Sequence, residues 1–169
     1  MNRIIIHCGE GRGKSSSAAG VALRSLAHGR KVLAVQFFKP QPDSALLFLQ
    51  KKISGNLCIK NYGSWYFIDH PDENAGIIFR NALKEIRDLI AGENYDVIIL
   101  DEILYTTHFK ILEEDEIISL LEDFDGKSFI LTGRYAPEKL LETADTVSSI
   151  NCVKHAFDSG IKAQSGIEF

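Results

Sequence analysis

Six short runs of apolar residues recur along the chain, and each is bounded by turn-forming residues. Because these runs are almost continuously apolar rather than alternating, they are typical of strands that are covered on both faces. The predicted strands are Arg3–Cys8, Lys31–Phe37, Leu57–Asn61, Asp96–Leu100, Ser128–Thr132 and Thr146–Ile150.

Segments of helical periodicity lie between the predicted strands. The clearest covers residues 72–91, where apolar residues return every three or four positions, with Pro71 before it and Gly92 after it. Further helices are predicted at Lys14–His28, Glu113–Leu121 and Pro137–Thr143. Strands that alternate with helices in this way predict a mostly parallel sheet between layers of helices, with ligands at the carboxyl ends of the strands.

The least regular stretch of the chain is Lys39–Asp69. It contains Pro40, Pro42 and, apart from one predicted strand, a run of polar and aromatic residues at 62–68. We expect this stretch to form a loop that contacts the substrate.

The composition is that of an ordinary folded domain. The chain has 169 residues, of which 45% are hydrophobic and 25% are charged, far from the composition of disordered chains. Lys and Arg number 19 against 23 Asp and Glu, a net charge of −4, and no basic run is present. A nucleic-acid partner is therefore not expected.

The cysteines and the apolar runs indicate a cellular compartment. Cys8, Cys58 and Cys152 are odd in number, widely spaced and set in apolar stretches, which indicates buried thiols in a reducing environment. No apolar run approaches the roughly 20 residues of a membrane span. The N-terminus enters residues 4–6, all isoleucine, without the apolar region of a signal peptide. We expect a cytoplasmic protein with no membrane partner.

A glycine-rich segment follows the first predicted strand directly and opens a helix of small residues. It consists of Gly9, Glu10, Gly11, Arg12, Gly13, Lys14, Ser15 and Ser16. In this context it indicates a P-loop, in which backbone N–H groups cradle phosphates, Lys14 bridges them and the Ser15 hydroxyl ligates Mg²⁺. The usual spacing would place the first glycine at Cys8, so Gly9 comes one residue late. The alternative is a strand-to-helix turn that binds nothing.

Charged residues follow two other predicted strands at the same edge of the sheet. Asp101 and Glu102 come after Asp96–Leu100, where carboxylates would complete a Mg²⁺ shell or, alternatively, cap the segment 103–109. Arg134 follows Ser128–Thr132, where it would clamp a phosphate or, alternatively, lie on the surface in water. These residues and the P-loop together predict a three-layer, RecA-like P-loop NTPase fold in a single domain of residues 1–169.

The end of the chain, residues 154–169, resembles the C-terminal signature of the P-loop ATP:corrinoid adenosyltransferases, the CobA/BtuR/CobO type. The resemblance covers nearly the whole chain in order: Gly9–Ser16, Ala22–Arg24, Gln36–Lys39, Leu100–Glu102, Thr132–Arg134 and Ala144–Val147.

The resemblance implies that the protein transfers the 5′-deoxyadenosyl group of ATP to the cobalt of cob(I)alamin or a related corrinoid and releases triphosphate. Cob(I) is itself a strong nucleophile, so no general base is needed. Mg²⁺ (or Mn²⁺) on Ser15, Asp101 and Glu102 would join the catalytic Lys14 and Arg134 in neutralising the leaving group.

The resemblance also implies the partners of the site. Gly9 to Ser16 and Arg24 would contact a nucleotide that lies reversed relative to ordinary P-loop ATPases, so that its ribose faces the corrinoid. The corrinoid-binding candidates are Trp65, Tyr66, Phe67, Lys154 and His155. The family further implies a homodimer and a flavin or flavoprotein reductant.

Three departures from the family pattern bear on how far the family's residue roles apply to this chain. Relatives commonly carry an N-terminal helical segment that covers the corrinoid, whereas the first strand here begins at Arg3. Relatives also carry a Gly-Phe-x-Trp element, whose aromatic residues help displace the lower axial ligand of the corrinoid and so ease reduction of cob(II) to cob(I). This chain has Gly63, Ser64 and then Trp65 there, one residue out of register. Pro40 stands where relatives usually have glycine after a lysine.

Two other functions remain open from the sequence. A P-loop ATPase or small-molecule kinase would use the same phosphate site on water or an acceptor hydroxyl. A non-catalytic paralogue would bind nucleotide or corrinoid without turnover.

Overall fold

The computed structural model describes residues 1–53, 55–64 and 73–167 of the chain. Its centre is a six-stranded sheet in the order β3-β2-β4-β5-β1-β6, and every strand pairing in the described part is parallel. The strands are β1 Arg3–Cys8, β2 Val32–Phe37, β3 Leu57–Tyr62, β4 Val97–Asp101, β5 Ser128–Thr132 and β6 Thr146–Ser149.

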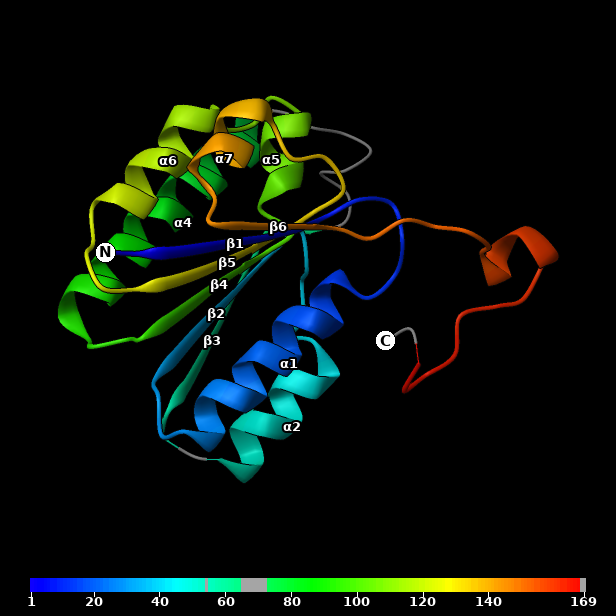
Figure 1. Ribbon diagram of the computed structural model, residues 1–169, viewed down its shortest axis with the longest axis horizontal. Coiled ribbons are helices and arrows are strands. Elements are labelled where there is room, and N and C mark those ends of the chain that lie inside the picture. The colour runs from blue at the N-terminus through cyan, green and yellow to red at the C-terminus, as the bar shows by residue number, and fades with distance from the viewer. Residues whose placement is uncertain (54, 65–72, 168–169) are drawn as a thin grey trace.

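Helices cover both faces of the sheet, so the predicted three-layer P-loop fold class is confirmed (Figure 1). One face carries α1 Lys14–Ala27 and α2 Ser44–Lys52. The other face carries α4 Glu73–Gly92, α5 Leu104–His108, α6 Glu114–Glu122 and α7 Glu138–Thr143. A 3₁₀ helix, η1 Ala156–Ser159, lies in the C-terminal segment. No helix in the described part is long and apolar enough to cross a bilayer.

The alternation of side chains along β2 explains why this strand is apolar throughout. Val32 and Ala34 pack into the core beneath α1 and α2, while Leu33 and Val35 pack into the core beneath α4 and α6. Because successive side chains of a strand point to opposite faces, a strand between two helix layers buries all of them. All six residues of β2 are buried, which confirms the prediction for this strand. The prediction of a doubly covered strand is wrong for β6, which lies at the edge of the sheet and is exposed except at the half-buried Ser148.

The expectation that Lys39–Asp69 is an irregular loop is wrong for residues 44–52. This segment forms α2, which begins where the Asp43 carboxylate accepts a hydrogen bond from the Ala45 amide. Its buried face consists of only Leu46 and Leu49. Two apolar anchors in nine residues are too few for a helical period to stand out from the sequence.

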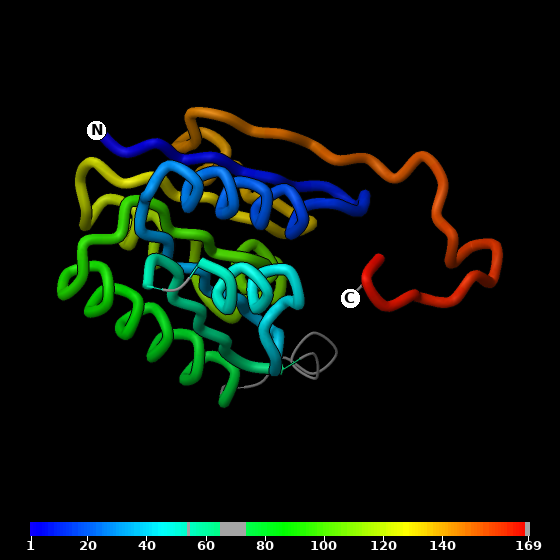
Figure 2. The backbone as a smooth tube through the Cα atoms, turned by 90° about the horizontal axis from the view of Figure 1, so that it is seen from below, coloured from blue at the N-terminus to red at the C-terminus, as the bar shows by residue number. Residues whose placement is uncertain are grey.

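The described chain after β6 crosses the P-loop and then leaves the body of the molecule. The amide of Ile150 donates to the carbonyl of Cys8 (2.8 Å), and the amide of Gly11 donates to the carbonyl of Ile150 (2.7 Å). Beyond this point the segment curves outward and returns (Figure 2), so that Arg12 donates to the carbonyl of Ile167 (2.9 Å). The prediction of a buried thiol is wrong for Cys152, which lies exposed on this segment, while Cys8 and Cys58 are half-buried.

Candidate functional site

The P-loop joins β1 to α1 with Lys14 at the first position of the helix. The Lys14 ammonium donates to the carbonyls of Gly9 and Gly11, both at 2.7 Å. Burial lowers the pKa of Lys14. The loop therefore curls around the lysine, and the amino end of α1 opens beside it, as in a phosphate-binding site.

Two glycines of the P-loop are also required by packing against the chain that follows β6. A Cβ on Gly9 would lie 2.5 Å from the carbonyl oxygen of Ile150, and one on Gly11 would lie 2.7 Å from that of Asn151. Gly9 also has a positive φ of 101°. The sequence pattern signals the phosphate-binding use of these glycines but not this contact, because residues 150 and 151 are remote in sequence.

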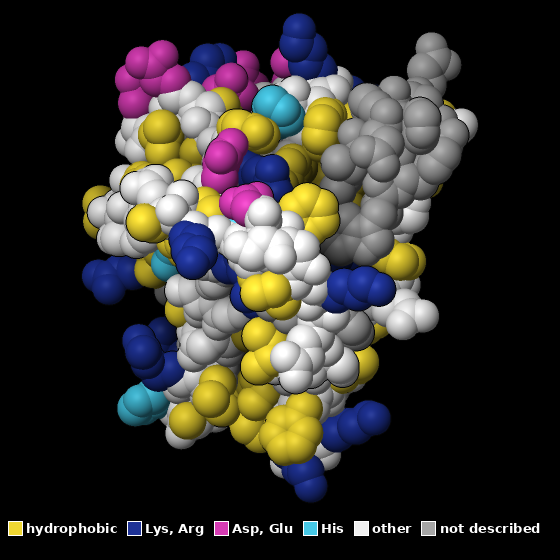
Figure 3. Space-filling view, turned by 90° about the vertical axis from the view of Figure 1, so that its right-hand side faces the viewer, with side chains coloured by type: hydrophobic (Ala, Val, Ile, Leu, Met, Phe, Trp, Pro, Cys, Tyr) yellow, Lys and Arg dark blue, Asp and Glu magenta, His cyan; other side chains and the backbone are white. Residues whose placement is uncertain are grey.

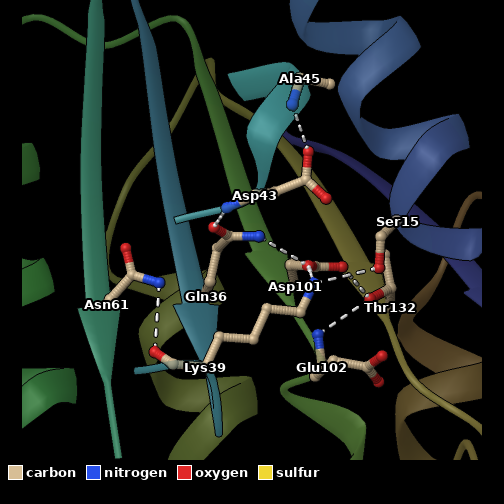
Figure 4. Close-up of polar contacts among 9 residues, drawn as sticks. All are labelled: Ser15, Gln36, Lys39, Asp43, Ala45, Asn61, Asp101, Glu102 and Thr132. Carbon is tan, nitrogen blue, oxygen red and sulfur yellow. Dashed lines mark hydrogen bonds and ion pairs between the residues drawn. The ribbon is translucent and has the colours of Figure 1, made fainter. Parts of the chain in front are cut away.

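Asp101, at the end of β4, is the centre of a buried polar cluster. Its Oδ1 accepts from the Thr132 hydroxyl (2.7 Å), and its Oδ2 accepts from Gln36 (3.1 Å) and from the Lys39 ammonium (2.6 Å), as Figure 4 shows. Burial alone would raise the pKa of Asp101, but the Lys39 charge and the three hydrogen bonds hold it below its ordinary value. Asp101 is thus an anion at neutral pH, and both of its oxygens already accept hydrogen bonds.

Glu102 is the next residue and has the opposite electrostatic environment. Its backbone adopts a positive φ of 64°, and its amide donates to the Thr132 hydroxyl (2.8 Å). Its Oε2 is buried and has no hydrogen-bond partner among the described residues. Burial, followed by the negative charge of Asp101, raises the pKa of Glu102 to about 7. A left-handed backbone at a non-glycine residue costs about 1 kcal/mol or more and is typical of functional sites.

Arg134 follows β5 and is tied to the P-loop by its backbone, since its carbonyl accepts from the Gly9 amide (2.9 Å). Gly133, immediately before it, has a φ of 154°, and a Cβ there would lie 2.5 Å from Cβ of Leu104 on α5. The glycine therefore allows α5 to pack directly against the strand end that carries Arg134.

These elements surround a cleft of about 780 Å³ at the carboxyl edge of the sheet. Figure 3 views the molecule from this side and shows acidic and basic side chains close together near the upper centre of the face. The predicted residues that line the cleft are Glu10, Gly11, Arg12, Gly13, Lys14, Ser15, Ser16, Glu102, Arg134 and His155. The sheet topology therefore brings the three predicted groups, from β1, β4 and β5, to one place.

Other predicted residues lie elsewhere. Arg24 lies exposed in the last turn of α1, roughly 15 Å along the helix from Lys14 at 1.5 Å per residue. Lys154 is exposed outside the cleft lining. The aromatic candidates, residues 65–67, lie outside the described residues.

Lys39 and Tyr105 also line the cleft. Neither was a candidate site residue by itself, although Lys39 begins the stretch that was expected to contact the substrate. A signal for Lys39 was available, because a lysine two residues past the second predicted strand lies at the same edge as the P-loop. Tyr105 belongs to α5, which is too short to give a periodic signal.

The cleft offers oxygen ligands of the kind that Mg²⁺ prefers. Glu102 carries a buried and unpartnered carboxylate oxygen, and the Ser15 hydroxyl lies at the helix start. The described residues contain no cluster of three or more His, Cys, Asp or Glu that could enclose a metal by themselves. The donor set therefore fits an ion that keeps several waters and shares its ligands with phosphates, rather than an all-protein cage.

Comparison with known proteins decides the family. Residues 1–169 match the model of the family described as ATP:corrinoid adenosyltransferase BtuR/CobO/CobP. The chain belongs to this family. It is 33% identical over 168 residues to the corrinoid adenosyltransferase of Escherichia coli K12, covering 98% of this chain and 85% of that protein. It is also 33% identical to the corrinoid adenosyltransferase of Pseudomonas aeruginosa, over 98% of this chain and 83% of that protein.

Solved structures outside the adenosyltransferase family share the fold alone. The KaiC-like protein of Pyrococcus horikoshii has a TM-score of 0.61 at 18% identity and covers 90% of this chain and 74% of that one. The flagellar accessory protein FlaH of Methanocaldococcus jannaschii has a TM-score of 0.58 at 21% identity, and the match covers 86% of this chain and 69% of that one.

Proposed function

We propose that the protein transfers the 5′-deoxyadenosyl group of ATP to the cobalt of cob(I)alamin or a related cob(I)corrinoid and releases triphosphate. The observation that carries this proposal is the cleft itself: a P-loop lysine, a second strand-end cation and one buried carboxylate face the same space, in a chain of this family. Such a site is suited to holding a triphosphate and stabilising it as a leaving group.

The reaction breaks one bond and forms one bond. The cobalt(I) electron pair attacks the ribose C5′, and the C5′–O5′ bond breaks as its electrons move to the triphosphate oxygen. No proton is removed from the nucleophile, so the site needs no base beside it. The work of the protein is to align C5′ with the cobalt and to neutralise the charge that grows on the triphosphate.

In this mechanism each side chain of the cleft has a separate task. Lys14 bridges phosphate oxygens at the amino end of α1, and Arg134 clamps phosphate from the end of β5. Ser15 and Glu102 would hold Mg²⁺, with Asp101 behind them. When bound, the ion supplies positive charge at the leaving triphosphate. Residues 9–16 supply the backbone amides around it, and Arg24 remains a candidate nucleotide contact.

The corrinoid would approach from the open side of the cleft. His155 lies at the cleft wall, where it is held by a hydrogen bond from the Phe157 amide to its Nδ1 (3.2 Å). We assign corrinoid contacts to His155, Lys154 and the aromatic residues 65–67. The family also supports a homodimer and electron supply by a flavin or flavoprotein, and three free cysteines support a reducing, cytoplasmic setting.

The test is anaerobic incubation of the protein with MgATP and chemically reduced cob(I)alamin, followed by absorption spectroscopy and a triphosphate assay. We expect light-sensitive adenosylcobalamin and triphosphate in equal amounts. Release of single phosphates without corrinoid would instead indicate an ATPase or kinase, and ligand binding with no product would indicate a binding protein.

A further inference from the structure

Lys39 lies between two residues that the sequence assigns to a metal shell. Its ammonium donates to Asp101 Oδ2 at 2.6 Å and to the Ser15 hydroxyl at 3.4 Å, and its side chain is 13% exposed, on the wall of the phosphate cleft. Figure 4 shows the Lys39 side chain reaching from the end of β2 across to Asp101 of β4 and Ser15 of α1. A positive charge is therefore already built into the place where a phosphate-bound cation is expected.

The backbone directly before Lys39 adopts an energetically unfavourable conformation. Phe38, directly before it, has a positive φ of 60° although it is completely buried. Its ring packs edge-on against Phe79 and Tyr105, with centroids 4.8 and 6.1 Å away. The Lys39 carbonyl accepts from the Asn61 side chain (3.2 Å). A left-handed conformation that costs about 1 kcal/mol or more persists only where surrounding packing enforces it, and here it turns the chain so that Lys39 faces the cleft.

Asp101 is better suited to hold this lysine than to bind a metal directly. Both of its oxygens accept hydrogen bonds from side chains, and Oδ2 accepts from both Gln36 and the Lys39 ammonium. An ammonium has three N–H donors, and two of them are used by Asp101 and Ser15. The third has no partner among the described residues of the cluster and is available to an anion in the cleft.

We propose that Lys39 is a second phosphate-binding lysine, which contacts the triphosphate of ATP alongside Lys14, and that Asp101 is its positioning partner rather than a metal ligand. This inference rests on the proposed function only in that a triphosphate occupies the cleft. The Lys39 ammonium then places a positive charge at the leaving group whether or not a divalent ion is bound.

The experiment measures binding of inorganic tripolyphosphate by calorimetry, once with a chelator and once with Mg²⁺. Lys39→Met removes the charge but leaves Asp101 buried and unpaired, which is expected to lower the melting temperature. The double variant Lys39→Met with Asp101→Asn removes both charges and is expected to recover stability. Lys39→Arg keeps the charge, and Lys60→Met is the matched control, because Lys60 forms an exposed ion pair with Glu85 (2.7 Å) on the neighbouring strand β3.

We expect the double variant to bind tripolyphosphate about tenfold more weakly than the unmodified protein in both media, while folding normally. Lys39→Arg should retain most of the affinity, and Lys60→Met should bind like the unmodified protein. Wild-type affinity in the folded double variant would overturn the proposal, since Lys39 would then only neutralise Asp101. A loss confined to the Mg²⁺ medium would also overturn it, since the cluster would then act through the metal.

No corrinoid enters this measurement, so its outcome is separate from that of the transfer assay. A protein that binds tripolyphosphate through Lys39 but forms no adenosylcobalamin would refute the proposed function and leave the role of Lys39 intact.

Discussion

Replacing Glu102 by glutamine removes a buried negative charge from the cleft while keeping the size and the left-handed backbone of the residue. Burial and the Asp101 charge raise the pKa of Glu102 to about 7, and Lys39, Lys14 and Arg134 oppose this shift only in part. Glutamine resembles the protonated acid, which carries no charge and offers one donor. The substitution therefore measures how much the Glu102 charge lowers the free energy of unfolding.

The direction of the change in stability with pH follows from the pKa of Glu102 in the folded and in the unfolded state. The pKa of Glu102 in the folded state, about 7, lies above its ordinary value of 4.5, so the folded protein binds the proton more tightly than the unfolded chain. Its contribution to stability is fully present below about pH 4.5 and is lost as the pH rises through about 7. The separation of the two values corresponds to roughly 3 kcal/mol in the free energy of unfolding.

We expect Glu102→Gln to be nearly as stable as the wild type at about pH 5 and to be more stable by about 2 to 3 kcal/mol at about pH 8. Urea unfolding at both pH values, in chelator and without nucleotide, measures this difference. Glu142→Gln on the exposed side of α7 is the control and should shift neither curve. Parallel pH profiles of Glu102→Gln and wild type, or a variant less stable at the higher pH, would refute the reasoning. A stabilised variant that has also lost transfer activity would show that the charge is kept for function.

Three further predictions concern the P-loop, the strand end and the aromatic segment. Lys14→Ala should lower ATP-dependent transfer about tenfold or more while leaving the far-ultraviolet circular dichroism unchanged, and unchanged turnover in the folded variant would rule out the phosphate role. Gly133→Ala should lower the free energy of unfolding by about 1 to 3 kcal/mol, because its Cβ would lie 2.5 Å from Cβ of Leu104. Gly20→Ala in α1 faces open space and should be neutral or stabilising by up to about 1 kcal/mol in the same urea titration. Trp65→Ala should impair product formation from cob(II)alamin with a flavin reductant more than from prepared cob(I)alamin, and equal losses would remove its role in displacing the axial ligand.

Much of the fold was predictable because its signals are local. The six predicted strands and four predicted helices match the structure to within one residue at each end. Doubly covered strands are apolar throughout, and α4 is long enough to repeat its period several times. Within residues 1–53, 55–64 and 73–167, the α-helices α2 and α5 were missed because both are short and have few buried residues. Their positions depend on what the sheet offers them to pack against.

The site was predictable only in part, for the same reason. The P-loop is one continuous segment, so Gly9 to Ser16 could be recognised from its glycines, its Gly-Lys-Ser sequence and its place between a predicted strand and a predicted helix. The parallel order of the strands then places Glu102 and Arg134 beside it, as expected for carboxyl ends that share an edge. The state of each charge was not predictable. Asp101 and Glu102 are adjacent in sequence, yet their pKa values shift in opposite directions, because only Asp101 is paired with Lys39.

The sequence by itself determined the apolar strands, the helix that follows the P-loop and the family to which the chain belongs, because each of these is signalled by short runs of consecutive residues. Only the tertiary structure decided which charges meet. Lys39 and Asp101 are 62 residues apart, and Gly9 touches a segment more than 140 positions further along the chain. Contacts of this kind depend on the order of the strands within the sheet. Burial then sets the strength of the contacts, because a charge removed from water is stabilised only by the partners that the fold brings to it.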